Sequence, residues 1–268
     1  MSRSMSDPLG AVLGLLALAA PLAPSLQAQQ PPWVLFRDLE YARPPGQSLR
    51  LDLYLPDQAG PGPWPVVVWF HGQPGRKYPT PARRLVRSGY AVASVEYRSP
   101  RDARFPTQVH DAKAAVRWLR ANAARHSLDP DHIAAWGESA GGYVAVMLAT
   151  SAGDSMLDGA DPGAPSSRVQ AAVNYFGPGQ RGPASPLRYL SADDAPVLTV
   201  HGSADRTVSP GRSERLHSAL QAAGVESTLE IVRGGRHDFA TVHTPRIDSL
   251  VRAFLDRHLQ SGSRPPAP

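Results

Sequence analysis

The fold is decided by residues 133–150, which read Ile-Ala-Ala-Trp-Gly-Glu-Ser-Ala-Gly-Gly-Tyr-Val-Ala-Val-Met-Leu-Ala-Thr. Residues 133–136 predict a short buried strand, and 142–150 predict a helix. The turn between them carries Ser139 at its apex, with a glycine two residues away on either side. A strand that reverses at once into a helix leaves no room for a Cβ at those two positions. Such a turn presents a serine hydroxyl as a nucleophile and directs the backbone N–H of Ala140 toward a developing oxyanion.

A glycine-rich turn with an incidental serine is the competing interpretation of this motif. Because Gly and Ser are each near ~7% of residues in average proteins, a chance G-x-S-x-G is expected in about one chain in ten of this size. The flanking strand and helix, and the partner residues found farther along the chain, favour the nucleophile.

Strands and helices alternate on both sides of this turn. The further strands are predicted at 66–70, 90–97, 169–176, 196–202 and 228–232, and the further helices at 80–88, 109–123, 213–223 and 245–259. Such alternation is typical of an α/β fold with a mostly parallel central sheet and helices on both faces. Ahead of it, strand-like runs at 33–41 and 49–55 flank a Pro-Pro-Gly turn, which predicts an antiparallel hairpin.

Two further polar residues follow predicted strands, as Ser139 does. Asp205 comes after the strand at 196–202, and His237 comes after the strand at 228–232. Because the carboxyl ends of parallel strands meet at one edge of a sheet, the three side chains are expected to lie together. In that arrangement His237 is the base that takes the serine proton, and Asp205 orients the imidazole.

Other histidines compete with His237 for the role of the base. His243 is the nearest rival, but it directly precedes a helix. His201 lies within a predicted strand and is expected in the core, and His71 is expected to be structural. The remaining five histidines lie on predicted helices or turns, where a solvated position is favoured.

Three aspartates compete with Asp205: Asp193, Asp194 and Asp238. The last of these adjoins His237 in the chain, and neighbouring residues rarely face each other as a triad requires. Glu138, beside the nucleophile, is expected to pair with a loop arginine and to have no catalytic role.

The loop after the strand at 66–70 is expected to complete the oxyanion site. It reads His-Gly-Gln-Pro-Gly, and it is placed where backbone N–H groups are left free to bind an anion. Either Gly72 or Gln73 is expected to donate beside Ala140, because the chemistry needs a second donor. An ordinary strand-to-loop turn is the alternative.

Substrate-binding residues are expected near 177–195, a compact loop rich in Pro and Gly. Tyr175, Phe176 and Tyr189 are candidate pocket walls. For Tyr175 and Phe176 a place in the aromatic core is an equal alternative.

Composition excludes several classes of protein. The chain has 268 residues, enough for one large domain, and it has no cysteine, so disulfides, thiolate nucleophiles and cysteine-ligated metals are excluded. The net charge of +5 comes almost wholly from arginines, which are spread along the chain and interleaved with acids. This pattern favours a solvated surface over a nucleic-acid-binding stripe.

Both ends of the chain differ from the middle. Residues 1–28 combine an early arginine, a short apolar run and a small residue for cleavage, which predicts a secretory signal peptide and a secreted or periplasmic protein. The apolar run is too short to span a bilayer, so no stable membrane anchor is expected. The catalytic domain is expected at 33–259, and a disordered tail at 260–268.

Five blocks in order resemble the α/β-hydrolase superfamily. They are PVVVWFHG at 65–72, YAVASVEY at 90–97, DPDHIAAWGESAGG at 129–142, PVLTVHGSAD at 196–205 and GRHDF at 235–239. Together they resemble, more narrowly, secreted bacterial esterases of the hormone-sensitive-lipase-like and feruloyl-esterase-like (BD-FAE-type) group. The resemblance covers residues 33–259, and it places the family's nucleophile, acid and base at Ser139, Asp205 and His237.

The resemblance implies a serine carboxylic-ester hydrolase that needs no cofactor or metal. It implies short acyl or aryl esters, including acetyl or feruloyl esters of plant polysaccharides. Many relatives have two or three glycines after the loop histidine, where this chain has Gly72 and then Gln73, which implies a restriction to simpler alcohols. A peptidase of the prolyl-oligopeptidase type and a catalytically silent binding protein are the alternatives.

Overall fold

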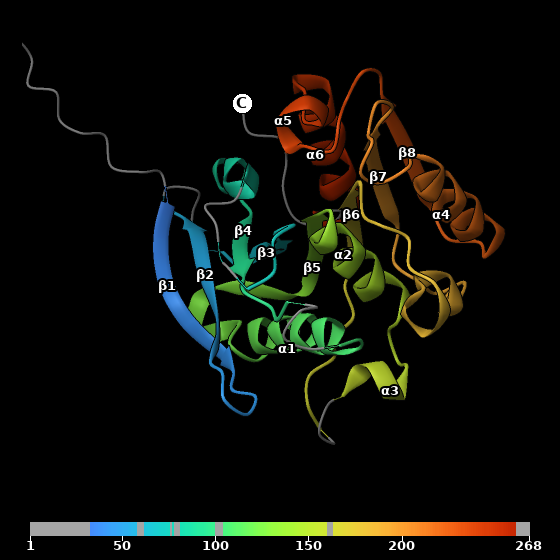
Figure 1. Cartoon of the computed structure of the whole chain (residues 1–268). Helices are drawn as coiled ribbons and strands as arrows, with labels where there is room; N and C mark the ends of the chain where they lie inside the picture. Colours follow the sequence, from blue (N-terminus) through green and yellow to red (C-terminus); the bar gives the residue numbers. More distant parts are fainter. Residues whose placement is uncertain are drawn as a thin grey trace, which may run out of the picture. The chain divides into compact units, whose positions relative to one another are not determined.

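The structure is a computed structural model that describes residues 33–57, 62–75, 77, 81–99, 104–159 and 163–260, with side chains at 81–83 omitted. The predicted signal peptide and residues 261–268 of the predicted tail lie outside these ranges. Within them, eight strands form one sheet in the order β1-β2-β4-β3-β5-β6-β7-β8 (Figure 1). The strands are β1 (Trp33–Ala42), β2 (Leu49–Pro56), β3 (Trp64–Phe70), β4 (Ala91–Val95), β5 (Leu128–Glu138), β6 (Ala171–Tyr175), β7 (Val197–Gly202) and β8 (Ser227–Val232).

The predicted fold class is confirmed. Strands β1 and β2 form the antiparallel hairpin, and β2 also pairs antiparallel with β4. All the other neighbouring pairs, from β4 and β3 across to β7 and β8, are parallel. The carboxyl ends of β5, β7 and β8 therefore share one edge of the sheet, the edge at which the predicted catalytic residues were expected.

Helices cover both faces of this sheet (Figure 1). The longer ones are α1 (Thr107–Ala121), α2 (Ala140–Thr150), α4 (Gly211–Ala222) and α6 (Pro245–Leu259), and 3-10 turns occur at Pro81–Ser88, Ala124–His126, Gly182–Ala184 and Pro186–Arg188. Alternate side chains of strand β3 belong to the hydrophobic cores on the two faces of the sheet. Val66, Val68 and Phe70 face α1 and α2, whereas Val67 and Trp69 face α6, as the period-two geometry of a strand requires.

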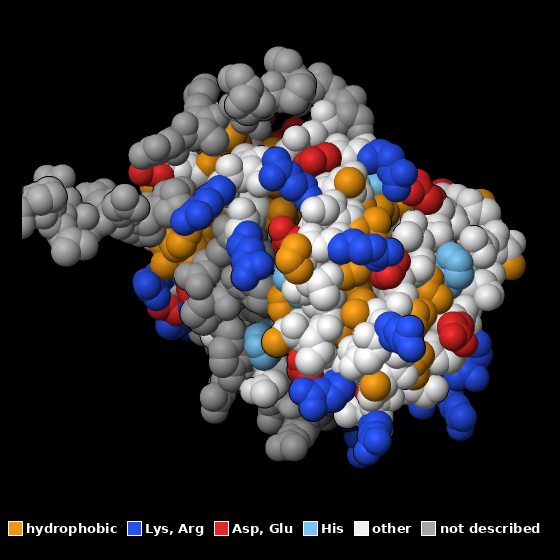
Figure 2. Space-filling view, turned by 90° about the horizontal axis from the view of Figure 1, so that it is seen from above, with side chains coloured by type: hydrophobic (Ala, Val, Ile, Leu, Met, Phe, Trp, Pro, Cys, Tyr) orange, Lys and Arg blue, Asp and Glu red, His pale blue; other side chains and the backbone are white. Residues whose placement is uncertain are grey.

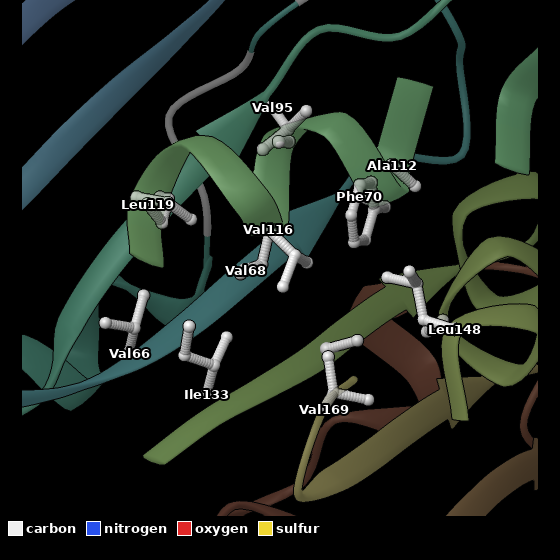
Figure 3. Close-up of a cluster of buried hydrophobic side chains, with 14 of the residues drawn as sticks. Val66, Val68, Phe70, Val95, Ala112, Val116, Leu119, Ile133, Leu148 and Val169 are labelled. Atoms are coloured by element: carbon white, nitrogen blue, oxygen red, sulfur yellow. The ribbon is translucent and has the colours of Figure 1, made fainter. Parts of the chain in front are cut away.

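The core on the α1 and α2 face consists mainly of aliphatic side chains from sheet and helices, together with aromatic ones such as Phe70 (Figure 3). Val116 and Leu119 of α1 lie against Val66, Val68 and Ile133 of the sheet, and all five are fully buried. Burial of each such side chain stabilises the fold by about 1.5–3 kcal/mol. This packing fixes the strands whose ends carry the site.

Two buried indoles form the floor beneath the serine turn. Trp69 of β3 and Trp136 of β5 make an edge-to-face pair with ring centroids 5.4 Å apart. Trp136 also packs against Tyr175 and Phe239. Both indole N–H groups are buried, and neither has a hydrogen-bond partner among the described residues.

Some elements differ from the sequence-based expectation. Two single-turn helices, α3 (Ser155–Asp158) and α5 (Phe239–Val242), were not predicted, because four residues are too few to show a helical period. Each begins at an aspartate whose side chain accepts an N–H of the first turn: Asp154 from Leu157, and Asp238 from Thr241. The helix predicted at 80–88 is a 3-10 helix, and β5 begins five residues before the predicted strand.

Charged side chains are mixed on the face seen in Figure 2. Arginine and lysine side chains there are interspersed with acidic and apolar ones, and they do not form a single stripe. Of the helices in the described part of the chain, none combines the length and the apolar composition that crossing a bilayer requires.

Candidate active site

The serine turn owes its shape to backbone crowding. A Cβ on Gly137 would lie 2.3 Å from the carbonyl of Gly141, and a Cβ on Gly141 would lie 1.9 Å from the carbonyl oxygen of Phe70. Both glycines are therefore required for space. The strained backbone belongs to Ser139 itself, whose φ is 50° and ψ −118°, a conformation that costs of order 1–3 kcal/mol. Its N–H donates to the carbonyl of Tyr175 at 2.9 Å, which helps to hold the turn.

The structure brings the three predicted catalytic side chains together. His237 Nε2 lies 3.0 Å from Ser139 Oγ, and His237 Nδ1 lies 2.7 Å from Asp205 Oδ2. These are the nucleophile–base and base–acid contacts that a serine hydrolase needs. They join the carboxyl ends of β5, β7 and β8 across 98 residues of sequence.

Glycine also explains why the acid and base loops meet. A Cβ on Gly202, the last residue of β7, would lie 2.3 Å from the carbonyl of Gly235 in the loop after β8. The N–H of Ala204 donates to the Gly235 carbonyl at 2.8 Å. The two loops thus pack backbone against backbone, and this contact sets Asp205 and His237 within hydrogen-bond distance.

The Asp205 carboxylate is surrounded by donors. Its Oδ1 accepts the backbone N–H groups of Thr207 at 2.8 Å and Val208 at 2.9 Å. Burial by itself raises the pKa of this carboxyl, but the hydrogen bonds from Val208, His237 and Thr207 outweigh burial and lower the pKa below its usual range. The carboxylate is therefore ionised at neutral pH. It holds the proton of His237 on Nδ1 and leaves Nε2 free to accept the serine proton.

His201 makes a second ring contact with the same carboxylate. It is fully buried in β7, with Nε2 3.1 Å from Asp205 Oδ2 and 2.9 Å from the Val208 carbonyl, and Nδ1 2.7 Å from Ser213 Oγ. Since Nε2 faces two acceptors, it carries the proton, and Nδ1 accepts the Ser213 hydroxyl. Burial lowers the pKa of His201, so the ring is neutral. The expected core position is found, but the contact with Asp205 was not foreseen.

The competing residues are engaged elsewhere. His243 lies between the Tyr175 hydroxyl at 2.8 Å and Asp248 at 3.0 Å. Asp193 and Asp194 accept the Ser191 hydroxyl, and Asp238 caps α5. None of these contacts involves Ser139 or His237.

The candidate pocket walls have three different surroundings. Tyr175 is fully buried, and its hydroxyl is used by His243, so it belongs to the aromatic core. Phe176 is buried with its ring 4.6 Å from the His237 ring, and it supports the base. Tyr189 donates its hydroxyl to the Pro183 carbonyl and closes the 183–189 loop on itself.

The loop after β3 lies against the nucleophile. A Cβ on Gly72 would lie 3.2 Å from Ser139 Cβ, so a larger residue would force the loop or the serine turn to shift by a few tenths of an ångström. The N–H of Gly72 bonds to the Glu138 carboxylate, and the N–H of Gln73 donates to His71 Nδ1 at 2.9 Å. Of the two expected loop donors, one is thus held by a carboxylate and the other by a neutral ring nitrogen.

The sequence predicted that Glu138 pairs with a loop arginine, but among the described residues its carboxylate makes no ion pair with an arginine. Its carboxylate lies 3.5 Å from His71 Nε2 and accepts the Gly72 N–H. Burial raises the pKa of Glu138 and lowers that of His71. The Tyr97 hydroxyl donates to the His71 carbonyl at 2.6 Å, so the loop is anchored on both sides. A residue next to the nucleophile therefore positions the oxyanion loop.

A cavity of about 330 Å³ adjoins this site. Its walls come from α2, from the start of α4 and from the segment 177–187. Tyr143 of the wall lies one helical turn from the nucleophile, with its N–H 3.1 Å from the Ser139 carbonyl. The catalytic side chains do not themselves line the cavity, which therefore lies beside the reacting atoms and can hold another part of a substrate.

Comparisons with known proteins agree with this architecture. The BD-FAE family model matches residues 51–182, which include the loop after β3 and the serine turn. The chain is 29% identical to Esterase LipQ of Mycobacterium tuberculosis over 81% of its own length, and it spans 61% of that relative.

Two solved structures share the fold. A truncated carbohydrate esterase from gut microbiota superposes with a TM-score of 0.72 at 24% identity, over 85% of this chain and 96% of that one. A bifunctional GH43-CE protein of Bacteroides eggerthii gives a TM-score of 0.74 at 29% identity, over 84% of this chain and 35% of that one. The sheet order and the serine turn are those of the α/β-hydrolase fold, and residues 51–182 are similar to the BD-FAE family.

Proposed function

We propose that the protein is a serine carboxylic-ester hydrolase that works through an acyl-enzyme. The observation that carries this proposal is the continuous hydrogen-bonded chain from Ser139 Oγ through His237 to Asp205. The similarity to Esterase LipQ supports the ester bond as the substrate.

In this proposal each group of the site has one role. His237 Nε2 takes the Ser139 proton as Oγ attacks the ester carbonyl carbon, and it returns that proton to the departing alkoxide, which leaves as the alcohol. His237 then takes a proton from a water molecule that attacks the acyl-enzyme, and release of the acid regenerates Ser139. Asp205 keeps the imidazole oriented and stabilises its protonated form in both steps.

The oxyanion is held by backbone donors. The N–H of Ala140, at the first position of α2, lies next to the nucleophile and has the positive end of the helix behind it. Gln73 is the better second donor, because an oxyanion displaces a neutral ring nitrogen more easily than it displaces the Glu138 carboxylate from Gly72.

The substrates proposed are short acyl or aryl esters, including acetyl or feruloyl groups on plant polysaccharides. The small number of residues between β6 and β7 supports an accessible site, and the likeness to the Bacteroides eggerthii GH43-CE protein supports a carbohydrate ester. Export, which the segment 1–28 predicts, would place the protein with such polymers.

The test is to measure initial rates on p-nitrophenyl acetate, butyrate and octanoate, on methyl ferulate and on acetylated xylan. The Ser139→Ala protein is the control, with its fold checked by circular dichroism. Serine-dependent turnover biased to short chains or to the plant esters is expected. Wild-type rates in the folded Ser139→Ala protein would overturn the assignment, and turnover of peptide anilides without esters would favour a peptidase.

A further inference from the structure

The cavity beside the nucleophile is cationic. Three arginines contribute to its wall, Arg181 from the 177–187 segment and Arg212 and Arg215 from α4. No aspartate or glutamate lines it, and the other polar side chains there, such as Gln180 and Ser185, are neutral. The positive charge of this wall is therefore not balanced within the cavity.

The arginines differ in what holds them. Arg212 donates to the Gly179 carbonyl and so joins α4 to the 177–187 segment. Arg181 and Arg215 are exposed, and neither guanidinium group makes a hydrogen bond or an ion pair with another described residue. Two guanidinium groups with free donors thus remain at a concave surface, where a carboxylate can be bound by paired N–H donors.

The cavity is connected to the reacting atoms through its own walls. Tyr143 follows Ser139 by one turn of α2, and its hydroxyl donates to the Ala184 carbonyl at 2.9 Å, which ties α2 to the arginine-bearing segment. Gly177, at the other end of that segment, directly follows Phe176, whose ring packs on His237. The cavity is thus walled by the same segments that carry Ser139 and pack against His237.

We propose that this cavity binds a carboxylate carried by the ester substrate, with Arg181 and Arg215 as its ligands. This inference rests on the proposed ester hydrolysis and adds the chemical class of the substrate, an ester with a free acid group such as a uronate or a dicarboxylic half-ester. The apolar side chains of Val146, Leu187 and Leu216 contact the carbon frame between the acid group and the ester.

The experiment compares matched anionic and neutral esters. Mono-p-nitrophenyl glutarate is paired with p-nitrophenyl valerate to place the acid on the acyl side. 4-Acetoxybenzoate is paired with its methyl ester to place the acid on the alcohol side. The quantity measured is the ratio of kcat/KM for the anionic ester to kcat/KM for the neutral ester, in the wild type and in variants.

The double variant Arg181→Gln/Arg215→Gln is expected to lower this ratio at least about tenfold for one of the two pairs of esters. The loss should come mainly from a higher KM for the anionic ester, and the rates on neutral esters should not change. Arg215→Glu should lower the ratio further by repulsion, and added salt should lower it in the wild type. Arg188→Gln, an exposed arginine of the same segment outside the cavity wall, is the matched control and should leave the ratio unchanged.

The two proposals fail in different ways. If the wild type hydrolyses the neutral esters and the ratio stays within about twofold in all the arginine variants, the carboxylate site is wrong and ester hydrolysis stands. If neither neutral nor anionic esters are hydrolysed in a serine-dependent manner, the proposed function itself is wrong.

Discussion

His201 shares with His237 a single oxygen of the Asp205 carboxylate. His201 Nε2 lies 3.1 Å from Oδ2, and His237 Nδ1 lies 2.7 Å from the same atom. The buried ring of His201 is in turn fixed by Ser213 of α4. The carboxylate of Asp205, the proposed catalytic acid, is thus held by β7 and α4 as well as by its own loop, and we expect His201 to act as a positioning residue.

Replacing His201 should weaken catalysis through Asp205. We expect His201→Leu to lower kcat about tenfold or more with little change in KM, and to destabilise the fold by about 1–3 kcal/mol through the unpaired Ser213 and Asp205 groups. His201→Gln, which keeps an N–H donor, should recover much of kcat. Wild-type kcat in a folded His201→Leu protein would contradict this role.

Asp205 and Asp238 offer a direct comparison of the chosen acid with its rival. Asp205→Asn should lower kcat about 10³- to 10⁴-fold, because the amide favours the wrong tautomer of His237. Asp238→Asn should keep kcat near that of the wild type, because its side chain caps α5 and asparagine caps a helix equally well. The measurement is kcat of both variants on one short ester, with circular dichroism as the check of folding. A large loss of kcat in Asp238→Asn and a small one in Asp205→Asn would make Asp238 the catalytic acid instead.

The crowded serine turn should tolerate no Cβ at Gly141. Alanine there would place its Cβ 1.9 Å from the Phe70 carbonyl oxygen, and the nearest obstacle is backbone that belongs to a central strand. We expect Gly141→Ala to lose the folded state or to destabilise it by more than about 4 kcal/mol. Gly211→Ala is the control, since only side-chain atoms lie near its Cβ, at 3.5 Å and beyond. Urea unfolding of both proteins measures the difference, and a stable Gly141→Ala protein would show the turn to be more adaptable than described.

Mild acid should weaken the folded protein through its buried histidines. Burial lowers the pKa of His71, His126, His201, His243 and His258, which are neutral in the folded state. Below the ordinary histidine pKa of about 6.5, the unfolded chain takes up protons that the folded chain does not. The free energy of unfolding should therefore fall as the pH drops from about 7 to 5. Urea titrations at several pH values test this, and a flat profile in that window would contradict it.

Much of the site follows from local sequence, because strands, helices and turns have short-range signatures. The alternation of apolar runs predicts the succession of strands and helices along the chain and a mostly parallel sheet. The rule that parallel strands end at one edge predicts that Ser139, Asp205 and His237 meet, which the structure then shows as hydrogen bonds. Helices α3 and α5 were missed because one turn has no period, although an aspartate marks the start of each.

Contacts that depend on how loops fold back onto the sheet had no signature in the local sequence. The partner of Glu138 depends on how the loop after β3 folds over the serine turn, and the contact of His201 with Asp205 depends on the loop after β7 turning back on its own strand. The burial of Tyr175 depends on His243, 68 residues later. The arginine wall likewise forms only when α4 packs beside the 177–187 segment.

The indole floor beneath the serine turn has an optical consequence. Trp136 stands three residues before the nucleophile, and it and Trp69 are buried, with no hydrogen-bond partner for either indole N–H among the described residues. Indoles in such surroundings emit at shorter wavelengths than indoles in water, and their emission shifts when water enters. The protein therefore carries an intrinsic fluorophore at its reaction centre. Comparing the wild type with Trp136→Phe would isolate its signal and report whether the catalytic half opens before the rest of the sheet unfolds.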